Sequence, residues 1–367
     1  MFDFIPVQYY SAVYYNILLA VVFVVFVHSY FTSIQDEENF RSRNWFSIGF
    51  LGFIIIFMGL RPISGRYFSD MGTYAHVFEA YAAGQNLQVD KDLVFEYFIL
   101  LSSYVMTVEM FFLLCAILYV WPLYVVSKKF FNNYWFYGFL MLVVSMSFWG
   151  YGTNGIRNGI ATSLFLYGFT IKNKYKALAI FILTVLIHKS LVLPTLAYVI
   201  TMFYKETRTY LKFWLLTIPL SLALGGFWES FFLGLGFGEE DRLKGYLTQG
   251  DELLDVAVQT GFRWDFLLYS ATGVFAGWYF VIRKKFDDPV YARLFNMYLI
   301  TNGFWVLVIR ANFSNRFAYL SWFMLGVIII YPLLKMEFVK KQHQFMGLLM
   351  FAYFIFTYML NFILTKE

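Results

Sequence analysis

The chain has 367 residues, of which 60% are hydrophobic and 14% are charged, with a formal net charge of +5 at pH 7. Soluble domains are about 45–50% apolar and about 25% charged, so this composition excludes a soluble globular protein. It predicts an all-α polytopic membrane protein forming a single integral membrane domain over residues 1–367. The modest charge gives no reason to expect nucleic-acid binding. The single cysteine, Cys115, excludes disulfides and cysteine metal sites within the chain.

Apolar runs near the ~20-residue length that spans a bilayer predict about twelve transmembrane helices. They cover residues 9–31, 46–60, 109–127, 134–150, 156–171, 177–188, 190–204, 213–235, 265–282, 292–309, 317–334 and 345–364. The first run follows no basic segment and no small-residue cleavage site, which favours a retained helix over a signal peptide. A further run at 94–107 is predicted to lie in the membrane interface or to re-enter the membrane, because a crossing there would reverse the charge pattern that follows.

The charges between the runs predict the topology. Lysine-rich clusters fall on one face, which the positive-inside rule makes cytoplasmic: Lys128/Lys129, Lys172/Lys174/Lys176, Lys205/Arg208/Lys212, Arg283/Lys284/Lys285 and Lys335/Lys340/Lys341. Both termini and two longer loops, about 61–108 and 236–264, then lie on the opposite, outer face. The second loop would be a lid, a docking surface or a mere connector.

The outer face is richer in arginine than in lysine: Arg61, Arg66, Arg157, Arg242, Arg263, Arg310 and Arg316. Arginine recognises phosphate and carboxylate through two parallel hydrogen bonds, so this asymmetry favours an anionic substrate reached from outside.

The first outer loop begins with Arg61, directly after an apolar run, and continues through Arg66 to Asp70 and Tyr74. Asp70 and Tyr74 share one face if this segment is helical. The functional interpretation has the two arginines bind an anion while Asp70 orients one of them or acts as a base. The alternative is an interfacial salt bridge.

Two acidic features follow in the same loop. Asp90-Lys-Asp92 could hold a divalent metal, but the pattern is short and common, and a solvated turn is the preferred interpretation. Glu96 is a candidate partner for an outer arginine, or the polar end of an interfacial helix.

Arg157 lies in a glycine-rich bend and is the only charged residue between Lys129 and Lys172. A guanidinium within the membrane costs at least about 2.5–3.5 kcal/mol unless it finds water, a partner or a ligand. Asn158 and the other polar neighbours supply no countercharge. The partner must therefore come from elsewhere in the chain or from an anionic substrate, unless the side chain merely extends to the headgroups.

His188 stands between two short apolar runs on the outer side. It could take a proton from a hydroxyl nucleophile, or it could be a structural histidine at a helix break.

Near the C-terminus, Arg310 and Arg316 flank a tight turn, with Tyr319 one helical turn further on. These arginines either repel each other or share an anion, which is the preferred interpretation. Aromatic residues make up 23% of the chain and suit an interfacial belt, or stacking on sugar rings.

In their order along the chain, these motifs resemble the EpsG-like family of bacterial polysaccharide polymerases, a branch of the Wzy-type O-antigen and capsule polymerases. The resemblance rests on Arg61, Asp70-x3-Tyr74, Glu96-Tyr97, Gly155-Ile-Arg157-Asn-Gly-Ile-Ala161, His188-Lys-Ser190 and Asn315-Arg316-x2-Tyr319. The family usually has Arg-Gln where this chain has Arg157-Asn158, and often Glu-Pro-Gly in place of Glu96-Tyr97-Phe98.

The resemblance implies a GT-C-like scaffold and a metal-independent, inverting glycosyl transfer without a cofactor. The reaction and the two longer loops would then lie on the periplasmic face of the bacterial inner membrane. Donor and acceptor would be glycans linked to undecaprenyl pyrophosphate, and a chain-length regulator and a flippase would be further partners. Combined with the residues above, it assigns catalytic roles to His188, Asp70 and Arg157. The expected substrate-binding residues are Arg61, Arg66, Tyr74, Glu96, Asn158, Arg310, Arg316 and Tyr319.

Three other functions stay open at this point. One is another GT-C glycosyltransferase that uses a lipid monophosphate sugar and a metal held by Asp90 and Asp92. The second is a flippase or exporter of lipid-linked glycans, and the third is a membrane O-acetyltransferase. The outer clustering of the isolated charges argues against transport, which would place charges on both sides of the membrane.

Overall fold

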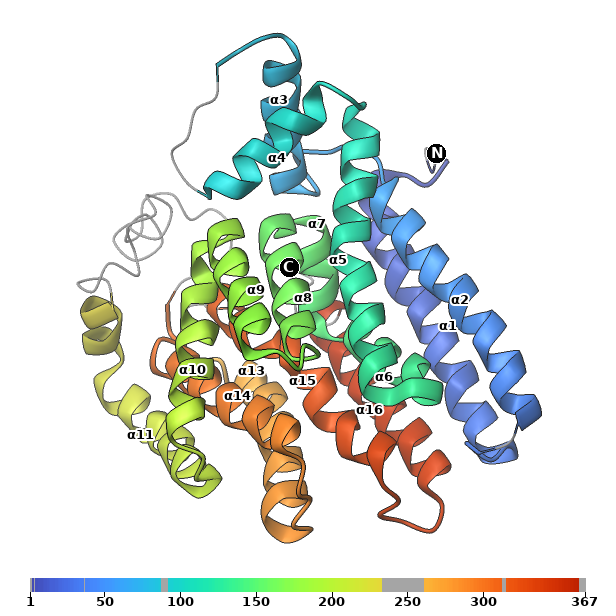
Figure 1. Ribbon diagram of the computed structural model, residues 1–367, viewed down its shortest axis with the longest axis vertical. Helices are drawn as coiled ribbons and strands as arrows, with labels where there is room; N and C mark the ends of the chain where they lie inside the picture. The colour runs from blue at the N-terminus through green and yellow to red at the C-terminus, as the bar shows by residue number, and fades with distance from the viewer. Residues whose placement is uncertain are drawn as a thin grey trace. The chain divides into compact units, whose positions relative to one another are not determined.

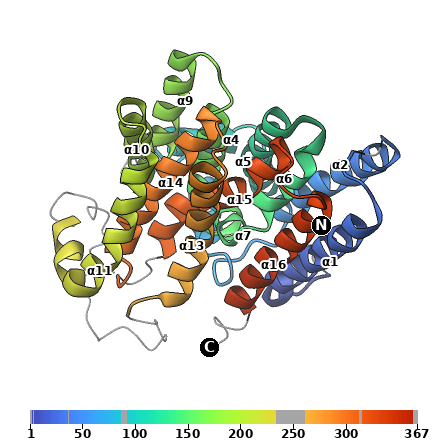
Figure 2. The ribbon, with the colours of Figure 1, turned by 90° about the horizontal axis from the view of Figure 1, so that it is seen from below.

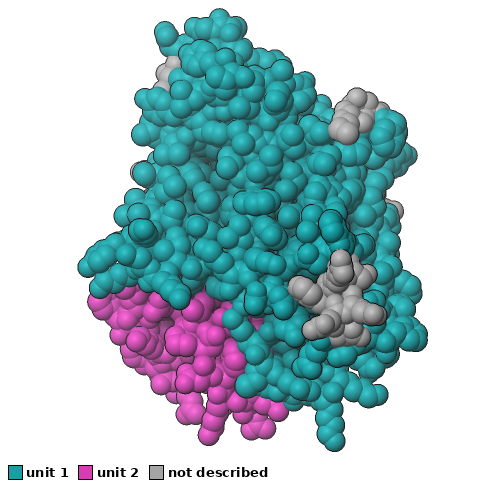
Figure 3. All heavy atoms as spheres, turned by 45° about the vertical axis from the view of Figure 1, so that its right-hand side comes forward, with its two compact units in different colours: residues 1–195, 333–359 teal, residues 196–332, 360–367 magenta. Residues whose placement is uncertain are grey.

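The computed structural model describes residues 2, 4–35, 37–86, 92–232, 261–311 and 315–362, apart from the side chains of 37–42, 229, 232, 315 and 316. Within these ranges the regular structure is entirely helical (Figure 1). The chain divides into two compact units (Figure 3). Unit 1 comprises residues 1–195 and 333–359, and unit 2 comprises residues 196–332 and 360–367.

Unit 1 contains the N-terminal helices, the short helices of the first outer loop and most of the last helix. Its elements are η1 (Val7–Tyr9), α1 (Tyr10–Phe31), α2 (Glu37–Gly59), α3 (Ser69–Ala82), α4 (Leu93–Ser103), α5 (Val108–Phe131), η2 (Asn132–Tyr134), α6 (Trp135–Val143), α7 (Met146–Thr153), α8 (Ile156–Gly168), α9 (Lys174–Ile187), η3 (Lys189–Leu191) and, up to Met359, α16 (Gln342–Phe362).

Helix α5 is central to unit 1, where it packs against α2, α6 and α8, and α8 packs in turn against α9. The outer-loop helix α3 buries Met71, Tyr74 and Phe78, whose spacing of three or four residues places them on one face. That helix packs against α4, and α4 contacts α9. The loop is thereby folded over the ends of the longer helices (Figure 1).

Unit 1 has two chemically different ends. The starts of α4 and α8 and the end of α9 lie at one end, together with α3 (Figure 1). At the other end, Lys129 at the close of α5 donates a 3.2 Å hydrogen bond to Thr170, which follows α8. The α1–α2 and α15–α16 turns lie at this second end, where Lys335, Lys340 and Lys341 cluster.

Unit 2 contains the remaining helices. They are most of α10 (Val192–Phe203), α11 (Thr207–Phe232), α13 (Trp264–Gly277), the π-helical η5 (Trp278–Arg283), α14 (Pro289–Leu307) and, up to Pro332, α15 (Asn315–Lys335). Helix α14 packs against α11 and α13. A buried amide, Asn302, links helices of this unit by accepting from Trp214 at 2.7 Å and donating to Ser270 and Ser321.

Every predicted apolar run coincides with helix, which confirms the all-α expectation for the described residues. In that part of the chain, six helices are long and apolar enough to cross a membrane. The predicted number of about twelve crossings stays a prediction. The run at 134–150 is not one continuous helix but is divided into α6 and α7 at Val144–Ser145. The run at 94–107 forms α4, whose 11 residues are too few to span a bilayer as a straight helix.

Candidate active site

The first element of the site is the corner between α7 and α8, which presents Arg157. Gly155 occupies the N-cap position of α8, with no side-chain cap, and Arg157 lies in the first turn. A Cβ at Gly159 would lie 2.8 Å from the backbone oxygen of Tyr151, so this corner closes only with glycine there. The glycine-rich sequence thus serves a close backbone approach that fixes where Arg157 emerges.

The partner of Arg157 is Asp92, which comes from the outer loop. Arg157 Nη1 lies 2.7 Å from Asp92 Oδ2, and the Asp92 side chain has no exposed surface. The interpretation of Asp92 as part of a solvated turn was therefore wrong. We expected the countercharge of Arg157 to come from elsewhere in the chain or from a substrate. Asp92, 65 positions away in the chain, supplies it.

Asp92 is placed by an unusual backbone conformation. It occupies the N-cap position of α4 with φ +34°, in the left-handed region, which aspartate tolerates better than most residues. Its carboxylate makes no capping hydrogen bond, although its backbone oxygen accepts from the amides of Phe95 and Glu96. The side chain is therefore directed away from its own helix, toward α8 and α9.

His188 completes the cluster at the end of α9. Its backbone is extended, and the short helix η3 begins immediately after it. Its Nδ1 lies 3.0 Å from Asp92 Oδ2, and the amide of Lys189 donates to Asp92 Oδ1 at 3.3 Å. The side chain of His188 is 11% exposed and that of Arg157 is 22% exposed, so the cluster is buried around Asp92 and partly open at Arg157 and His188.

The electrostatics of the cluster keep Asp92 ionised. Burial alone would raise the pKa of Asp92, but the hydrogen bond from His188 and the positive charges of His188 and Arg157 together lower it below its ordinary value of 3.8. An ionised carboxylate can only accept hydrogen bonds. His188 therefore carries its proton on Nδ1 and donates it to Asp92, which leaves Nε2 as an acceptor when the imidazole is neutral.

Two of the predicted substrate-binding residues, Tyr74 and Asn158, lie beside this cluster. The Arg157 guanidinium lies 5.6 Å from the ring centroid of Tyr74, a cation–π distance. Asp70 lies one turn before Tyr74 on α3, and its charge acts on both Tyr74 and Arg157. Asn158 Oδ1 accepts a 2.9 Å hydrogen bond from Ser190, which ties α8 to η3 beside His188.

Other predicted residues of unit 1 make different contacts. Arg61 is buried and donates to the backbone oxygens of Met58 at 2.5 Å and Thr153 at 3.2 Å, so it joins the ends of α2 and α7. Glu96 accepts from Tyr81 at 3.2 Å, linking α4 to α3. Arg66 is exposed and lies over the ring of Tyr67.

The remaining predicted residues belong to unit 2. Arg310 is exposed and donates to the backbone oxygen of Leu222 at 3.3 Å. Tyr319 packs against Trp322, with ring centroids 5.6 Å apart. The side chain of Arg316 and the whole of Asp90 lie outside the described residues.

Asp92 is the residue of this site that sequence reasoning did not single out as a partner of Arg157. The sequence holds no specific signal for this contact, because an acidic residue directly before a short apolar run is expected to cap its own helix rather than to reach a neighbouring one. Across the described ranges, no group of three or more histidine, cysteine or acidic side chains lies close enough to hold a metal ion.

Comparison with known proteins identifies the family. No curated protein and no solved structure matches the chain. Residues 44–366 match the model of the EpsG family, and this range includes every residue of the cluster. The chain therefore belongs to the EpsG family, a family of glycosyltransferase-like membrane proteins of the polysaccharide polymerase type.

Proposed function

We propose that this protein polymerises oligosaccharide repeat units carried on undecaprenyl pyrophosphate, at the periplasmic face of the bacterial inner membrane, to build O-antigen, capsule or exopolysaccharide. The observation that carries this proposal is the contact of Asp92 with both His188 and Arg157. This contact brings the oriented imidazole of His188 and the guanidinium of Arg157 together. Glycosyl transfer from a lipid pyrophosphate needs a base for the attacking hydroxyl and a cation for the leaving pyrophosphate.

His188 is the proposed general base. Asp92 holds its Nδ1–H, so Nε2 can take the proton of the attacking hydroxyl while Asp92 stabilises the imidazolium that forms. The acceptor oxygen forms a bond to the anomeric carbon of the donor as the bond from that carbon to the pyrophosphate oxygen breaks. The pyrophosphate leaves with the bonding electrons, and the proton stays on His188.

Arg157 is proposed to stabilise the leaving pyrophosphate. One guanidinium nitrogen, Nη1, contacts Asp92, and the Arg157 side chain stays 22% exposed, so part of it can still reach a ligand. It lies in the first turn of α8, where the N-cap glycine provides no side-chain acceptor for the first amides. The positive end of a helix and a guanidinium together favour a phosphate group at this position.

The roles of the other predicted residues follow from their positions. Tyr74 and Asp70 on α3 would border the space in front of Arg157, and Asn158 would keep η3 and His188 in place through Ser190. Asp70 is the less favoured base, because His188 has an oriented carboxylate partner. Metal-dependent transfer through Asp92 is disfavoured because its side chain is completely buried and already contacts Arg157 and His188.

The experiment is a size profile of surface glycan from cells that lack this gene and are complemented with wild type, Arg157→Ala or Arg263→Ala. Arg263 is the control because it too pairs with a carboxylate, Asp265, at 2.6 Å. The proposal predicts single repeat units without long chains in the deletion strain, and restored long chains with wild type and Arg263→Ala. Arg157→Ala should be present in the membrane but restore no long chains. Loss of the single unit in the deletion strain would instead indicate an earlier transferase or a flippase.

A further inference from the structure

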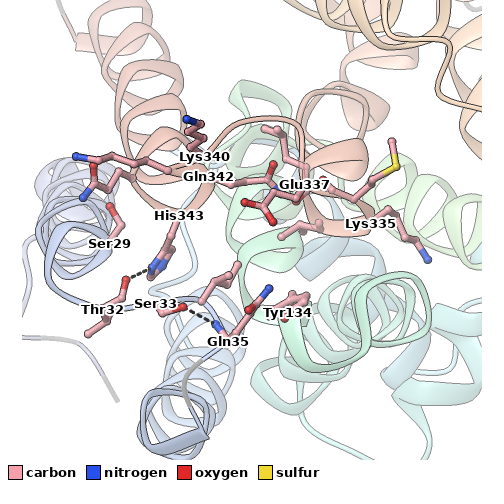
Figure 4. Close-up of a pocket in the computed structure, with 16 residues that line it drawn as sticks. Ser29, Thr32, Ser33, Gln35, Tyr134, Lys335, Glu337, Lys340, Gln342 and His343 are labelled. Atoms are coloured by element: carbon pink, nitrogen blue, oxygen red, sulfur yellow. Dashed lines mark hydrogen bonds between the residues drawn. The ribbon is translucent and has the colours of Figure 1, made fainter.

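A cavity of about 410 Å³ lies at the end of unit 1 opposite the Asp92 cluster (Figure 4). It is lined by the α1–α2 turn, the α15–α16 turn and Tyr134 of η2, all of which belong to unit 1. None of the residues that line it takes part in the proposed polymerisation chemistry. It is therefore a candidate for a separate site.

The walls of this cavity are polar and predominantly basic. Lys335, Lys340 and Lys341 contribute three cationic side chains, against one carboxylate from Glu337. The hydroxyls of Ser29 and Thr32 and the amide groups of Gln35 and Gln344 add neutral hydrogen-bonding groups. This mixture suits an anionic ligand that also carries hydroxyl groups.

The side chain of Gln342 fixes the α15–α16 turn, which carries Lys340 and Lys341. Gln342 Nε2 donates to the backbone oxygens of Leu333 at 2.6 Å and Met336 at 2.9 Å, and Gln342 Oε1 accepts from the amide of Phe338 at 2.7 Å. The two ends of the α15–α16 turn are thereby cross-linked. A cavity whose cationic wall is already ordered loses less conformational entropy when it binds a ligand.

His343 fixes the opposite wall. Its Nδ1 lies 2.7 Å from the backbone oxygen of Thr32, so Nδ1 carries a proton, and its Nε2 then accepts from Tyr137 Oη at 2.6 Å. Figure 4 shows the imidazole directed toward Thr32. Arg43 is buried behind this pair and donates to Tyr137 Oη at 3.5 Å, which adds a positive charge to this end of the unit.

An apolar surface begins beside the cavity. Helices α1 and α16 run side by side (Figure 2), and Phe26 stacks on Phe351 with ring centroids 5.1 Å apart. A Cβ at Gly347 would lie 2.1 Å from Ser29 Oγ, so the two helices approach closely next to the cavity wall. Phe23 on α1 and Phe345 and Leu348 on α16 remain 52%, 42% and 47% exposed. In a bilayer such a surface faces lipid chains.

We propose that this cavity binds the headgroup of an anionic phospholipid of the phosphatidylglycerol class, with its acyl chains lying on the α1–α16 seam. The lysines would bind the phosphate, and Ser29, Thr32 and Gln35 would bind the glycerol hydroxyls. Basic cavities between transmembrane helices are recognised as sites for anionic headgroups, and the lysine-rich end is the one that the positive-inside rule makes cytoplasmic. This inference does not depend on the proposed polymerase activity.

The test is lipid binding by the purified full-length protein in detergent. Melting temperature and native mass spectrometry would be followed while phosphatidylglycerol, phosphatidylcholine or inorganic phosphate is added. The proposal predicts bound phosphatidylglycerol and a raised melting temperature, with at least about tenfold weaker binding of phosphatidylcholine and no effect of phosphate. Equal binding of the two lipids would overturn it. Saturation by inorganic phosphate that displaces the lipid would overturn the choice of a lipid and indicate a soluble phosphate ligand.

A matched pair of variants locates the site. Lys340→Gln with Lys341→Gln removes two charges from the cavity, and both lysines are exposed, so the fold should be retained. Lys174→Gln with Lys176→Gln removes two exposed charges from the start of α9, at the same end of unit 1 but outside the cavity. The first variant should weaken phosphatidylglycerol binding at least about tenfold, and the second should leave it unchanged. An equal loss in both would show non-specific attraction and contradict the proposal.

Discussion

Asp92 and His188 lie 96 residues apart in the chain, yet His188 Nδ1 is 3.0 Å from Asp92 Oδ2. The contact joins the N-cap residue of α4 to the break between α9 and η3. Arg157 shares the same carboxylate oxygen at 2.7 Å. The segment 61–108, in which the sequence pointed to Asp70 as the acidic residue, therefore supplies the acidic centre of the candidate site through Asp92.

Replacement of Arg157 by lysine should distinguish the effect of its positive charge from the effect of its planar guanidinium. Lysine can keep the ion pair with Asp92, but it lacks the planar pair of donors that holds a phosphate. We expect Arg157→Lys to reach the membrane at wild-type levels while losing at least about tenfold in polymer synthesis, measured as long-chain glycan per cell. Arg263→Lys, which changes an arginine paired with Asp265, should retain wild-type synthesis. Full activity of Arg157→Lys would contradict a bidentate phosphate contact.

The glycine corner makes a steric prediction. A methyl group at Gly159 would meet the backbone of Tyr151, which cannot move as a side-chain end can. Gly159→Ala should destabilise the protein by about 1–3 kcal/mol and displace Arg157, lowering both melting temperature and synthesis. Gly49→Ala on α2, where no atom lies within 4 Å of the added carbon, is the matched control and should match wild type. Equal melting temperatures for the two variants would show that this corner is not tight.

Arg61 should prove to be a stabilising residue. Its Nη atoms bind the backbone oxygens of Met58 and Thr153, and burial lowers its pKa only to about 10, so it stays charged at neutral pH. Arg61→Met would leave these buried acceptors without a donor, at a cost of about 1–3 kcal/mol for each. We expect a lower melting temperature and less protein in the membrane. A variant that is as stable as wild type but inactive would favour the substrate-binding role that the family resemblance implies.

The lowered pKa of Asp92 predicts how stability depends on pH. The folded pKa lies below the unfolded value of 3.8, so the ionised carboxylate contributes stability above about pH 3.8, and this contribution is lost as the pH falls through the folded pKa. In detergent, Asp92→Asn should melt below wild type at neutral pH. The difference between the two should shrink as the pH falls below about 4. A difference that stays constant between neutral and acidic pH would contradict this electrostatic role.

The helices could be predicted from the sequence because the length of an apolar run and the residues that interrupt it are local properties of the chain. The start of α8 after a glycine-rich bend and the break at His188 both follow from composition and periodicity. Arg157 was singled out because a lone guanidinium in an apolar region needs a partner.

The identity of that partner could not be derived in the same way. Asp92 is buried because α4 packs against α9, a tertiary contact with no periodic signature in the sequence. Glu96 was a candidate partner for an outer arginine or the polar end of an interfacial helix, and its carboxylate accepts a hydrogen bond from Tyr81 of α3. Arg61 was expected to bind an anion, and its burial, which depends on how α2 packs against its neighbours, is likewise a tertiary property.

The most direct test of the central claim is chain extension by the purified protein reconstituted in lipid nanodiscs with a lipid-pyrophosphate-linked repeat unit. We predict that His188→Gln lowers the extension rate by about 10²–10⁴-fold, as expected for loss of a general base. Asp92→Asn should lower kcat with little change in KM, because Asp92 orients the imidazole and stabilises its charged form without contacting the substrate. Wild-type extension by His188→Gln would contradict the assignment of His188 as the base and the account of this site.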